Sequence, residues 1–224
     1  MALSLLAMNL SVGKNPKKNY IIAGMGNGSI YFWEKGKCVK ALVGHTGSVS
    51  ALCKRNDANS FISGDKSGKI IVWSDNFTKE KQINLLKTYS PSTMVVALSH
   101  GSKKQLLIGT KGGNILLLNH GDGIDKAKQV MSGHCDGMVW AVALGGNFIY
   151  TGGEDQRLIK WDYKNSKKWI KETKCPYKIR SIDLNSKANI LVVGFYNGVI
   201  MMYNSETLEK IDKLFYTKIK NPDQ

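Results

Sequence analysis

Short runs of apolar residues alternate with polar turns along the chain, and one pattern occurs five times. In each copy a β-rich run leads into a tight polar turn and then into a second β-rich run. The five segments read YIIAGMGNGSIYFW, SFISGDKSGKIIVW, QLLIGTKGGNILLL, FIYTGGEDQRLIKW and ILVVGFYNGVIMMY. Two such runs around a short turn predict a β-hairpin in every copy.

The five hairpins are evenly spaced. Their last residues are Trp33, Trp73, Leu118, Trp161 and Tyr203, at intervals of 40, 45, 43 and 42 residues. In four copies a glycine, which accepts the positive φ of a tight turn, stands five residues before that end, and Gln156 replaces it in the fourth. A shared period with shared internal spacing indicates a repeat protein.

Two further β-rich runs flank each hairpin, such as SVSALC before one and KWIKET after another. The N-terminal MALSLLAMNL lacks the basic start and cleavage site of a signal peptide and is expected to be a strand. Because no helical period is sustained, the predicted fold class is all-β. Four antiparallel strands per repeat predict a β-propeller. Its blades are expected near residues 1–43, 44–88, 89–132, 133–175 and 176–217.

Several motifs make the chain resemble the WD-repeat family. Gly44-His45 and Gly133-His134 match the Gly-His pair of that family, and only Trp161-Asp162 completes its Trp-Asp pair. The resemblance implies a buried network of histidine, aspartate, hydroxyl residue and tryptophan in a blade. In the fourth blade these residues are His134, Asp155, Thr151 and Trp161.

The second blade matches this network only in part. It has His45, Ser63 and Trp73, but Ser67 stands where the family places the aspartate. An incomplete network is therefore expected in this blade.

A histidine, a hydroxyl and an aspartate also suggest a catalytic triad. A triad needs a nucleophile that is open to substrate and lies beside an oxyanion hole. Here the hydroxyl falls within a strand, and the network would pack between sheets, where its polar groups satisfy one another. We therefore expect a structural clasp, no catalytic residue and no enzyme.

A narrower resemblance rests on LLIGTKGGNILLL, GHCDGMVWAVAL, TGGEDQRLIKWD and ILVVGFYNGVIMMYNSETLE. These stretches are similar to successive blades of the echinoderm microtubule-associated-protein-like family, and the similarity covers roughly residues 60–209. Its most specific element is Gly-Met-Val-Trp at 137–140. Members of that family carry tandem propellers that bind tubulin and microtubules. Because five blades are too few for a tandem pair, and WD-repeat propellers more often have seven, we expect part of a larger propeller. Either a longer chain or a partner would supply the missing blades.

The net charge changes the choice of partner. It is +15, from 32 basic and 17 acidic residues, which favours an acidic protein surface, nucleic acid or an anionic membrane. The lysines are scattered, so a solvated lysine-rich surface is the competing interpretation. No stretch has the roughly 20 apolar residues of a membrane-spanning helix. Four cysteines without a CxxC pair indicate reduced thiols, and no metal or cofactor is expected. The isolated His100 and His120 are expected to be solvated.

In a propeller, two positions of each blade point toward one face. The position at the hairpin turn holds Gly26, Lys66, Lys111, Glu154 and Tyr196. The position at the start of the inner strand holds Ser50, Val96, Trp140 and Arg180, with Lys178 two residues before the arginine. The candidate binding residues are Lys66, Lys111, Trp140, Lys178, Arg180 and Tyr196. Packing of Trp140 in the central channel and solvation of the lysines are the alternatives.

Together these features predict a non-enzymatic interaction module that binds tubulin, microtubules or another acidic protein surface. Its expected location is the cytoplasm, on the cytoskeleton or in cilia. Nucleic acid is the less favoured partner, and no membrane contact is expected. The alternative is a general WD-repeat scaffold, or an adaptor in a ribonucleoprotein or ubiquitin-ligase assembly.

Overall fold

The computed structural model describes residues 1–10, 18–85, 94–101, 104–119, 128–132, 137–163 and 168–214. Over these residues the chain forms five four-stranded antiparallel sheets. The predicted all-β fold is confirmed. The sequence order of the strands is also their order within each sheet, from the inner strand to the outer one.

The strands have the following bounds. The first blade contains β1 (Ala2–Leu10), β2 (Lys18–Met25), β3 (Ser29–Glu34) and β4 (Lys37–Val43), and the second contains β5 (Val49–Lys54), β6 (Phe61–Asp65), β7 (Lys69–Trp73) and β8 (Lys79–Asn84). The third contains β9 (Val95–His100), β10 (Gln105–Thr110), β11 (Asn114–Asn119) and β12 (Lys128–Ser132). The fourth contains β13 (Val139–Gly145), β14 (Phe148–Gly153), β15 (Arg157–Asp162) and β16 (Lys168–Lys174), and the fifth contains β17 (Ile179–Asn185), β18 (Ile190–Phe195), β19 (Ile200–Asn204) and β20 (Lys210–Leu214).

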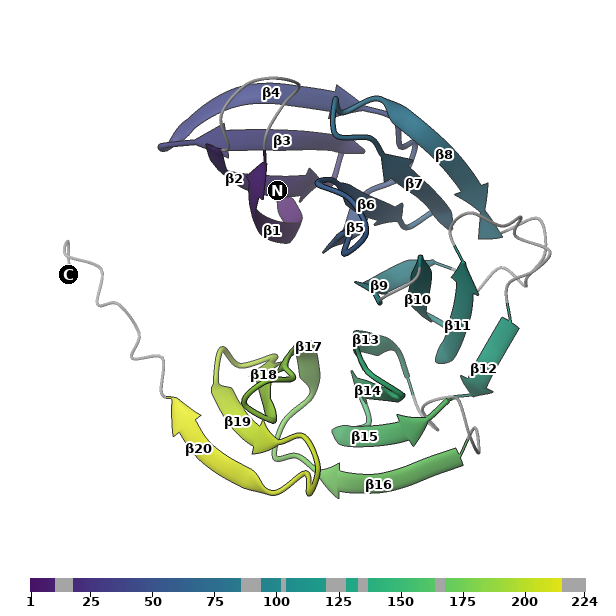
Figure 1. Ribbon diagram of the computed structural model, residues 1–224, viewed down its shortest axis with the longest axis vertical. Helices are drawn as coiled ribbons and strands as arrows, with labels where there is room; N and C mark the ends of the chain where they lie inside the picture. The colour runs from purple at the N-terminus through teal and green to yellow at the C-terminus, as the bar shows by residue number, and fades with distance from the viewer. Residues whose placement is uncertain are drawn as a thin grey trace.

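The five sheets stand around a common centre as the blades of a propeller (Figure 1). The inner strands pack side by side in the order β1, β5, β9, β13 and β17. Between the fifth blade and the first the ring is open (Figure 1). The prediction of a propeller with five four-stranded blades is therefore confirmed.

Apolar side chains hold consecutive blades together. One buried cluster fills each of the four interfaces between neighbouring blades. At the second interface, for example, Ile70 and Ile83 of one blade meet Val95 and Leu106 of the next. Burial of each such side chain contributes about 1.5–3 kcal/mol, so these interfaces are a main source of stability.

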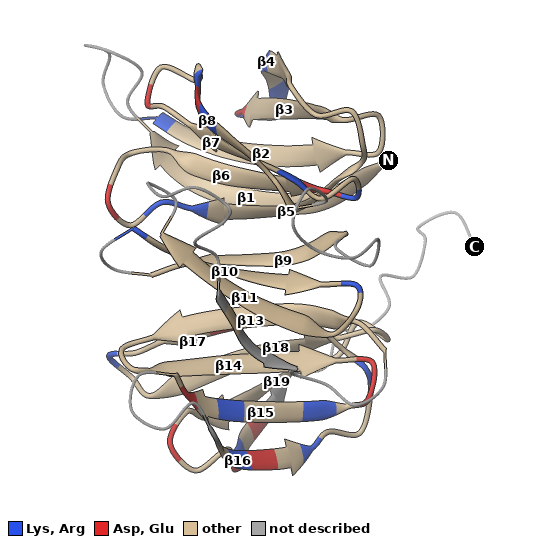
Figure 2. Cartoon of the chain, turned by 90° about the vertical axis from the view of Figure 1, so that its right-hand side faces the viewer, with Lys and Arg blue, Asp and Glu red and all other residues tan. Residues whose placement is uncertain are grey.

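Charged residues lie mainly on the connecting turns and the outer strands (Figure 2). The inner strands β9 and β13 contain no lysine, arginine, aspartate or glutamate. This distribution keeps the interfaces between blades apolar and leaves charge at the ends and the rim of the propeller.

A glycine in the second strand of each of the first four blades lets the next blade approach closely. A Cβ atom on Gly152 would lie 2.4 Å from Cγ2 of Ile179, and one on Gly64 would lie 2.5 Å from Cγ1 of Val95. Only a residue without a side chain fits there. Gly194 occupies the same place in the fifth blade, but only Ser181 lies within 4 Å of a Cβ atom built on it.

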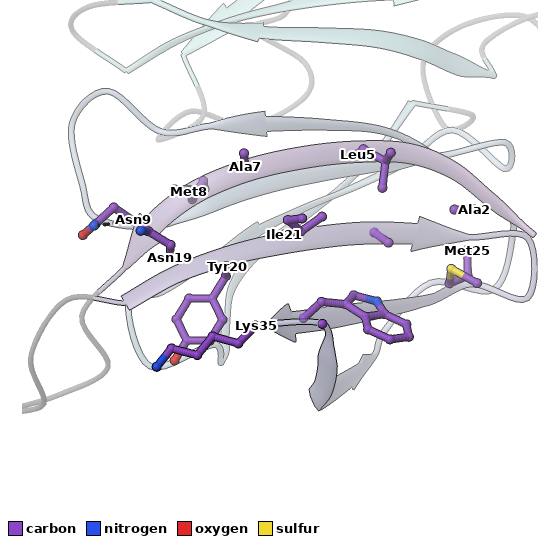
Figure 3. A pocket seen from close by; sticks show the side chains of 13 residues that line it. Ala2, Leu5, Ala7, Met8, Asn9, Asn19, Tyr20, Ile21, Met25 and Lys35 are labelled. Carbon is purple, nitrogen blue, oxygen red and sulfur yellow. Dashed lines mark hydrogen bonds between the residues drawn. The ribbon is translucent and has the colours of Figure 1, made fainter. Parts of the chain in front are cut away.

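The first blade borders the opening of the ring with an apolar sheet surface. Leu5 is 68% exposed, Ile21 55% and Trp33 39%, and together with neighbouring alanines they line a hollow of about 760 Å³ (Figure 3). A group of exposed apolar side chains of this kind commonly marks a contact surface.

Candidate functional site

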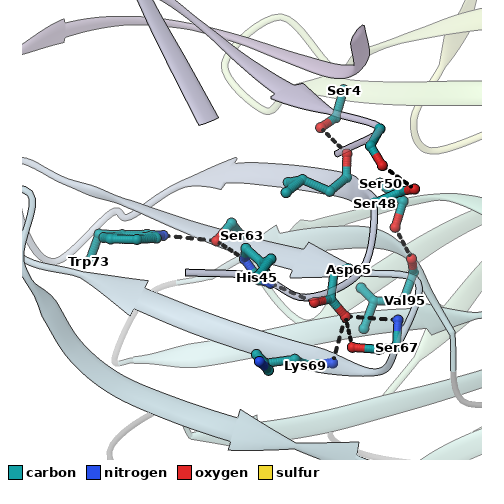
Figure 4. Close-up of polar contacts among 12 residues, drawn as sticks. Ser4, His45, Ser48, Ser50, Ser63, Asp65, Ser67, Lys69, Trp73 and Val95 are labelled. Carbon is teal, nitrogen blue, oxygen red and sulfur yellow. Dashed lines mark hydrogen bonds and ion pairs between the residues drawn. The ribbon is translucent and has the colours of Figure 1, made fainter. Parts of the chain in front are cut away.

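A chain of buried hydrogen bonds connects four side chains of the second blade (Figure 4). The indole Nε1–H of Trp73 donates to Oγ of Ser63 over 2.8 Å. The Oγ of Ser63 lies 2.6 Å from Nε2 of His45, and Nδ1 of His45 lies 2.8 Å from Oδ2 of Asp65. Because a carboxylate only accepts, Nδ1 of His45 carries the proton, and Nε2 accepts from the serine hydroxyl. Every polar group of these four side chains therefore has a hydrogen-bond partner.

Asp65 also stabilises the hairpin turn that follows it. Its Oδ1 accepts hydrogen bonds from the backbone N–H of Ser67 (2.8 Å), from the Ser67 hydroxyl (2.6 Å) and from the backbone N–H of Lys69 (3.0 Å). Burial alone would raise the pKa of Asp65, but the hydrogen bonds from His45, Ser67 and Lys69 outweigh it and lower the pKa to about 2. The carboxylate is therefore ionised at neutral pH.

The sequence correctly named His45, Ser63 and Trp73 as members of this network, but the expectation that the network is incomplete was wrong. Ser67 does stand at the family's aspartate position, but the network is complete because Asp65, two residues earlier, supplies the carboxylate to His45. Asp65 is the last residue of β6 and its side chain is fully buried beside the histidine, whereas Ser67 lies in the turn and donates to Asp65. The Asp-x-Ser-Gly turn sequence was the signal that could have identified it.

The fourth blade shows part of the predicted clasp. Nε1 of Trp161 donates to Oγ1 of Thr151 over 2.8 Å, which matches the Trp73–Ser63 bond of the second blade. Oδ1 of Asp155 accepts from the backbone N–H of Arg157 over 3.1 Å. His134 lies outside the described residues, so its predicted place in the network stays a prediction.

The clasp is not arranged for chemistry on a substrate. The hydroxyl that resembles a nucleophile, Ser63, is 0% exposed, lies within β6 and already accepts the indole proton of Trp73. The side chains of His45 and Asp65 are likewise fully buried. Within the described part of the chain, no group of three or more histidine, cysteine, aspartate and glutamate residues could hold a metal ion.

His100 departs from the expectation that it is solvated. It is 5% exposed, and its Nδ1 accepts a hydrogen bond from the backbone N–H of Asn56 over 3.1 Å. It therefore fastens the third blade to a loop of the second. His120 lies outside the described residues.

A β-bulge recurs at the start of every inner strand. The strand register shifts around one residue in each blade, at Leu3, Ser50, Val96, Trp140 and Arg180. A bulge redirects the side chain of the extra residue. All five bulge residues line the central channel, a hollow of about 650 Å³. The sequence placed the last four of them at one position, but nothing in it showed the bulge.

The hairpin-turn position is also equivalent in the blades. In four blades, the backbone N–H at this position donates to the carbonyl of the residue just before the inner strand of the same blade. The pairs are Lys66–Ser48, Lys111–Met94, Glu154–Met138 and Tyr196–Lys178. Lys66, Lys111, Lys178 and Tyr196 are exposed at this end of the propeller. We call this end, with the bulge residues, the bulge face.

On the bulge face, the fourth and fifth blades bring three predicted residues together. The guanidinium carbon of Arg180 lies 4.1 Å from the ring centre of Trp140 and 5.2 Å from that of Tyr196. Both contacts are cation–π interactions. Tyr196 is 70% exposed. Arg180 borders the central channel and also a groove of about 480 Å³ that Lys178, Tyr196 and Gln156 help to line.

Comparison with known proteins agrees with this geometry. The family model "WD domain, G-beta repeat" matches residues 36–74 and 125–162. The crystal structure of the RRP9 WD40 repeats superimposes with a TM-score of 0.69 at 15% identity, over 87% of this chain and 62% of that one. The chain therefore contains WD repeats and has the fold of a β-propeller.

Among WD-repeat proteins, the chain is similar to echinoderm microtubule-associated proteins. It is 28% identical to the 77 kDa echinoderm microtubule-associated protein of Strongylocentrotus purpuratus, over 80% of the chain and 26% of that protein. It is 26% identical to human echinoderm microtubule-associated protein-like 1, over 85% of the chain and 23% of that protein. The chain thus spans about a quarter of the length of these relatives.

Proposed function

We propose that this propeller is a non-enzymatic protein-interaction module that binds tubulin or microtubules through its bulge face. The observation that carries the proposal is the gathering of Lys66, Lys111, Lys178 and Arg180 at one end of the propeller, beside Trp140 and Tyr196. Arginine and aromatic residues are the usual anchors of protein interfaces, and exposed lysines add long-range attraction to an acidic partner.

Two further observations support this choice. The relatives reported above are named for their association with microtubules. The net charge of +15 suits the acidic outer surface of a microtubule. In this proposal the protein acts in the cytoplasm on the cytoskeleton, including that of cilia. Among the described residues, no helix combines the length and the apolar character needed to cross a membrane.

The second candidate function is that of an adaptor in a ribonucleoprotein or ubiquitin-ligase assembly. The observation that favours an RNA-containing partner is again the net charge of +15, since nucleic acid attracts a basic surface without any specific contact. The arrangement on the bulge face favours protein, because Arg180 already covers one face of Trp140 and one face of Tyr196. Fewer aromatic faces are then left on which the bases of a single-stranded nucleic acid could stack.

Co-sedimentation with microtubules, run beside an RNA-binding assay at the same salt concentration, tests this proposal. We expect the wild-type chain to sediment with microtubules and to bind an RNA oligonucleotide more weakly. RNA binding without microtubule binding would favour the second candidate.

A further inference from the structure

Arg180 differs from the other two arginines of the chain. Arg55 forms a two-pronged ion pair with Asp57, at 3.0 and 3.1 Å, and also contacts Glu80. Arg157 pairs with Glu172. Arg180 forms no ion pair with any carboxylate of the described residues, and it contacts two aromatic rings instead.

The aromatic contacts hold this guanidinium while its N–H groups have no hydrogen-bond partner among the described residues. A guanidinium stacks on rings through its flat faces, while its N–H groups project from its edges and fit the two oxygens of a carboxylate. Since Arg180 is already ordered by Trp140 and Tyr196, binding would cost little further side-chain entropy.

A second donor near the arginine also lacks a partner. Nε1 of Trp140 is buried and forms no hydrogen bond within the described part of the structure. Buried indole N–H groups normally find an acceptor, and an orphan one calls for an explanation. Lys178, two residues before Arg180, is exposed and lines the same groove as Arg180 and Tyr196.

From these contacts we infer that the Trp140–Arg180–Tyr196 cluster binds a carboxylate side chain of an acidic peptide segment. The segment lies in the groove between the fourth and fifth blades, with Lys178 facing a second acidic residue. This inference rests on the proposed function, because it names the point on the bulge face where the acidic partner is held. It narrows the partner's contact from a charged surface to a short peptide segment rich in carboxylates.

The test uses a fluorescein-labelled oligoglutamate peptide and fluorescence anisotropy with the full chain. Arg180→Gln should weaken binding by about tenfold or more, because a hydrogen bond to a charged group is lost. Arg180→Lys should recover little of that loss, since an ammonium group has no flat face to stack on the rings and cannot form a two-pronged hydrogen bond with a carboxylate. Lys187→Gln is the matched control: it removes the same charge from an exposed turn at the opposite end of the fifth blade and should leave binding within about twofold.

Two variants of the exposed Tyr196 guard against misfolding. Tyr196→Phe keeps the ring and should bind the peptide like wild type, whereas Tyr196→Ser should bind more weakly with an unchanged thermal melt. Equal losses in Arg180→Gln and Lys187→Gln would overturn the inference, because diffuse charge would then explain binding. Preference for a single-stranded RNA oligonucleotide of equal charge, with the same sensitivity to Arg180→Gln, would overturn it too.

The proposed function and this inference can fail separately. Sedimentation with microtubules that Arg180→Gln does not reduce, together with no peptide binding, overturns the inference alone. Peptide binding that depends on Arg180, without any sedimentation, supports the inference and overturns the microtubule proposal.

Discussion

Replacement of Asp65 by alanine tests the clasp of the second blade. The carboxylate accepts four hydrogen bonds, from Nδ1 of His45, from the N–H and hydroxyl of Ser67 and from the N–H of Lys69. Its loss would leave Nδ1 of His45 without an acceptor in a fully buried position. Ser67 and Lys69 of the turn are half-buried, so their donor groups can form hydrogen bonds with water instead.

The size of the effect follows from that difference. An unsatisfied buried donor costs about 1–3 kcal/mol, and loss of the charge-assisted bonds adds to it, so we expect about 3 kcal/mol for Asp65→Ala. In a chain of this length that loss lowers the melting temperature by about 6–12 °C. Ser67→Ala removes one hydroxyl hydrogen bond and keeps the backbone N–H that donates to Asp65, so it should cost about 1 kcal/mol or less.

Thermal melts and urea denaturation, followed by circular dichroism, compare the two variants with wild type. The ranking is the decisive result, because both residues belong to the same turn and differ mainly in the histidine contact. An Asp65→Ala chain as stable as wild type would refute the reasoning, and so would a Ser67→Ala chain destabilised to the same extent.

Three other outcomes follow from the structure. The pKa of Asp65 is lowered from 3.8 to about 2, so its ionised form stabilises the fold by about 2 kcal/mol above pH 4. This stabilisation is lost as the pH falls through about 2. In Asp65→Asn, urea denaturation at several pH values should show a free energy of unfolding that lacks this part of the pH dependence. Gly152→Ala forces a Cβ atom to within 2.4 Å of Ile179 and should cost about 1–3 kcal/mol in urea denaturation, whereas Gly194→Ala meets only the rotatable Ser181 side chain and should cost less. The apolar surface of the first blade should make the chain self-associate as its concentration rises, and light scattering should show less association for Leu5→Lys. A wild-type chain that stays monomeric at every concentration would contradict the interpretation of this surface as a contact surface.

The architecture was predictable because its signals are local. Alternating apolar residues, hairpin turns and an even spacing of Trp33, Trp73, Leu118, Trp161 and Tyr203 are all written in the sequence, and each blade is one supersecondary unit. Burial between blades follows from the apolar content of the strands. The five four-stranded sheets therefore match the pattern from which they were expected.

The missed details depend on contacts between segments. The role of Asp65 depends on the end of β6 lying next to His45. A rule that counts a fixed number of residues back from Trp73 does not find this aspartate. His100 is buried because a loop of the preceding blade covers it, which its polar neighbours in sequence do not show. In both cases the deciding partner lies 20 or more residues away.

The bulge face could be predicted only in part. The repeat spacing placed Trp140 and Arg180 at one position of consecutive blades. Their contact, at 4.1 Å, needs both the β-bulge that redirects each side chain and the packing of β13 against β17. Neither feature has a signature in a single sequence.

Salt-dependent co-sedimentation with microtubules tests most directly whether the bulge face binds an acidic partner. The chain to compare with wild type is the double variant Lys66→Glu and Lys111→Glu, with Lys54→Glu and Lys187→Glu as a control of equal charge change at the opposite end of the blades. At physiological salt, screening limits the attraction between exposed charges to about 8 Å, so the lysines contribute most at lower salt. At low salt, the Lys66→Glu, Lys111→Glu chain should therefore lose most of its sedimentation, whereas the control chain should keep it. If both double variants fold and sediment alike, the bulge face is not the binding surface.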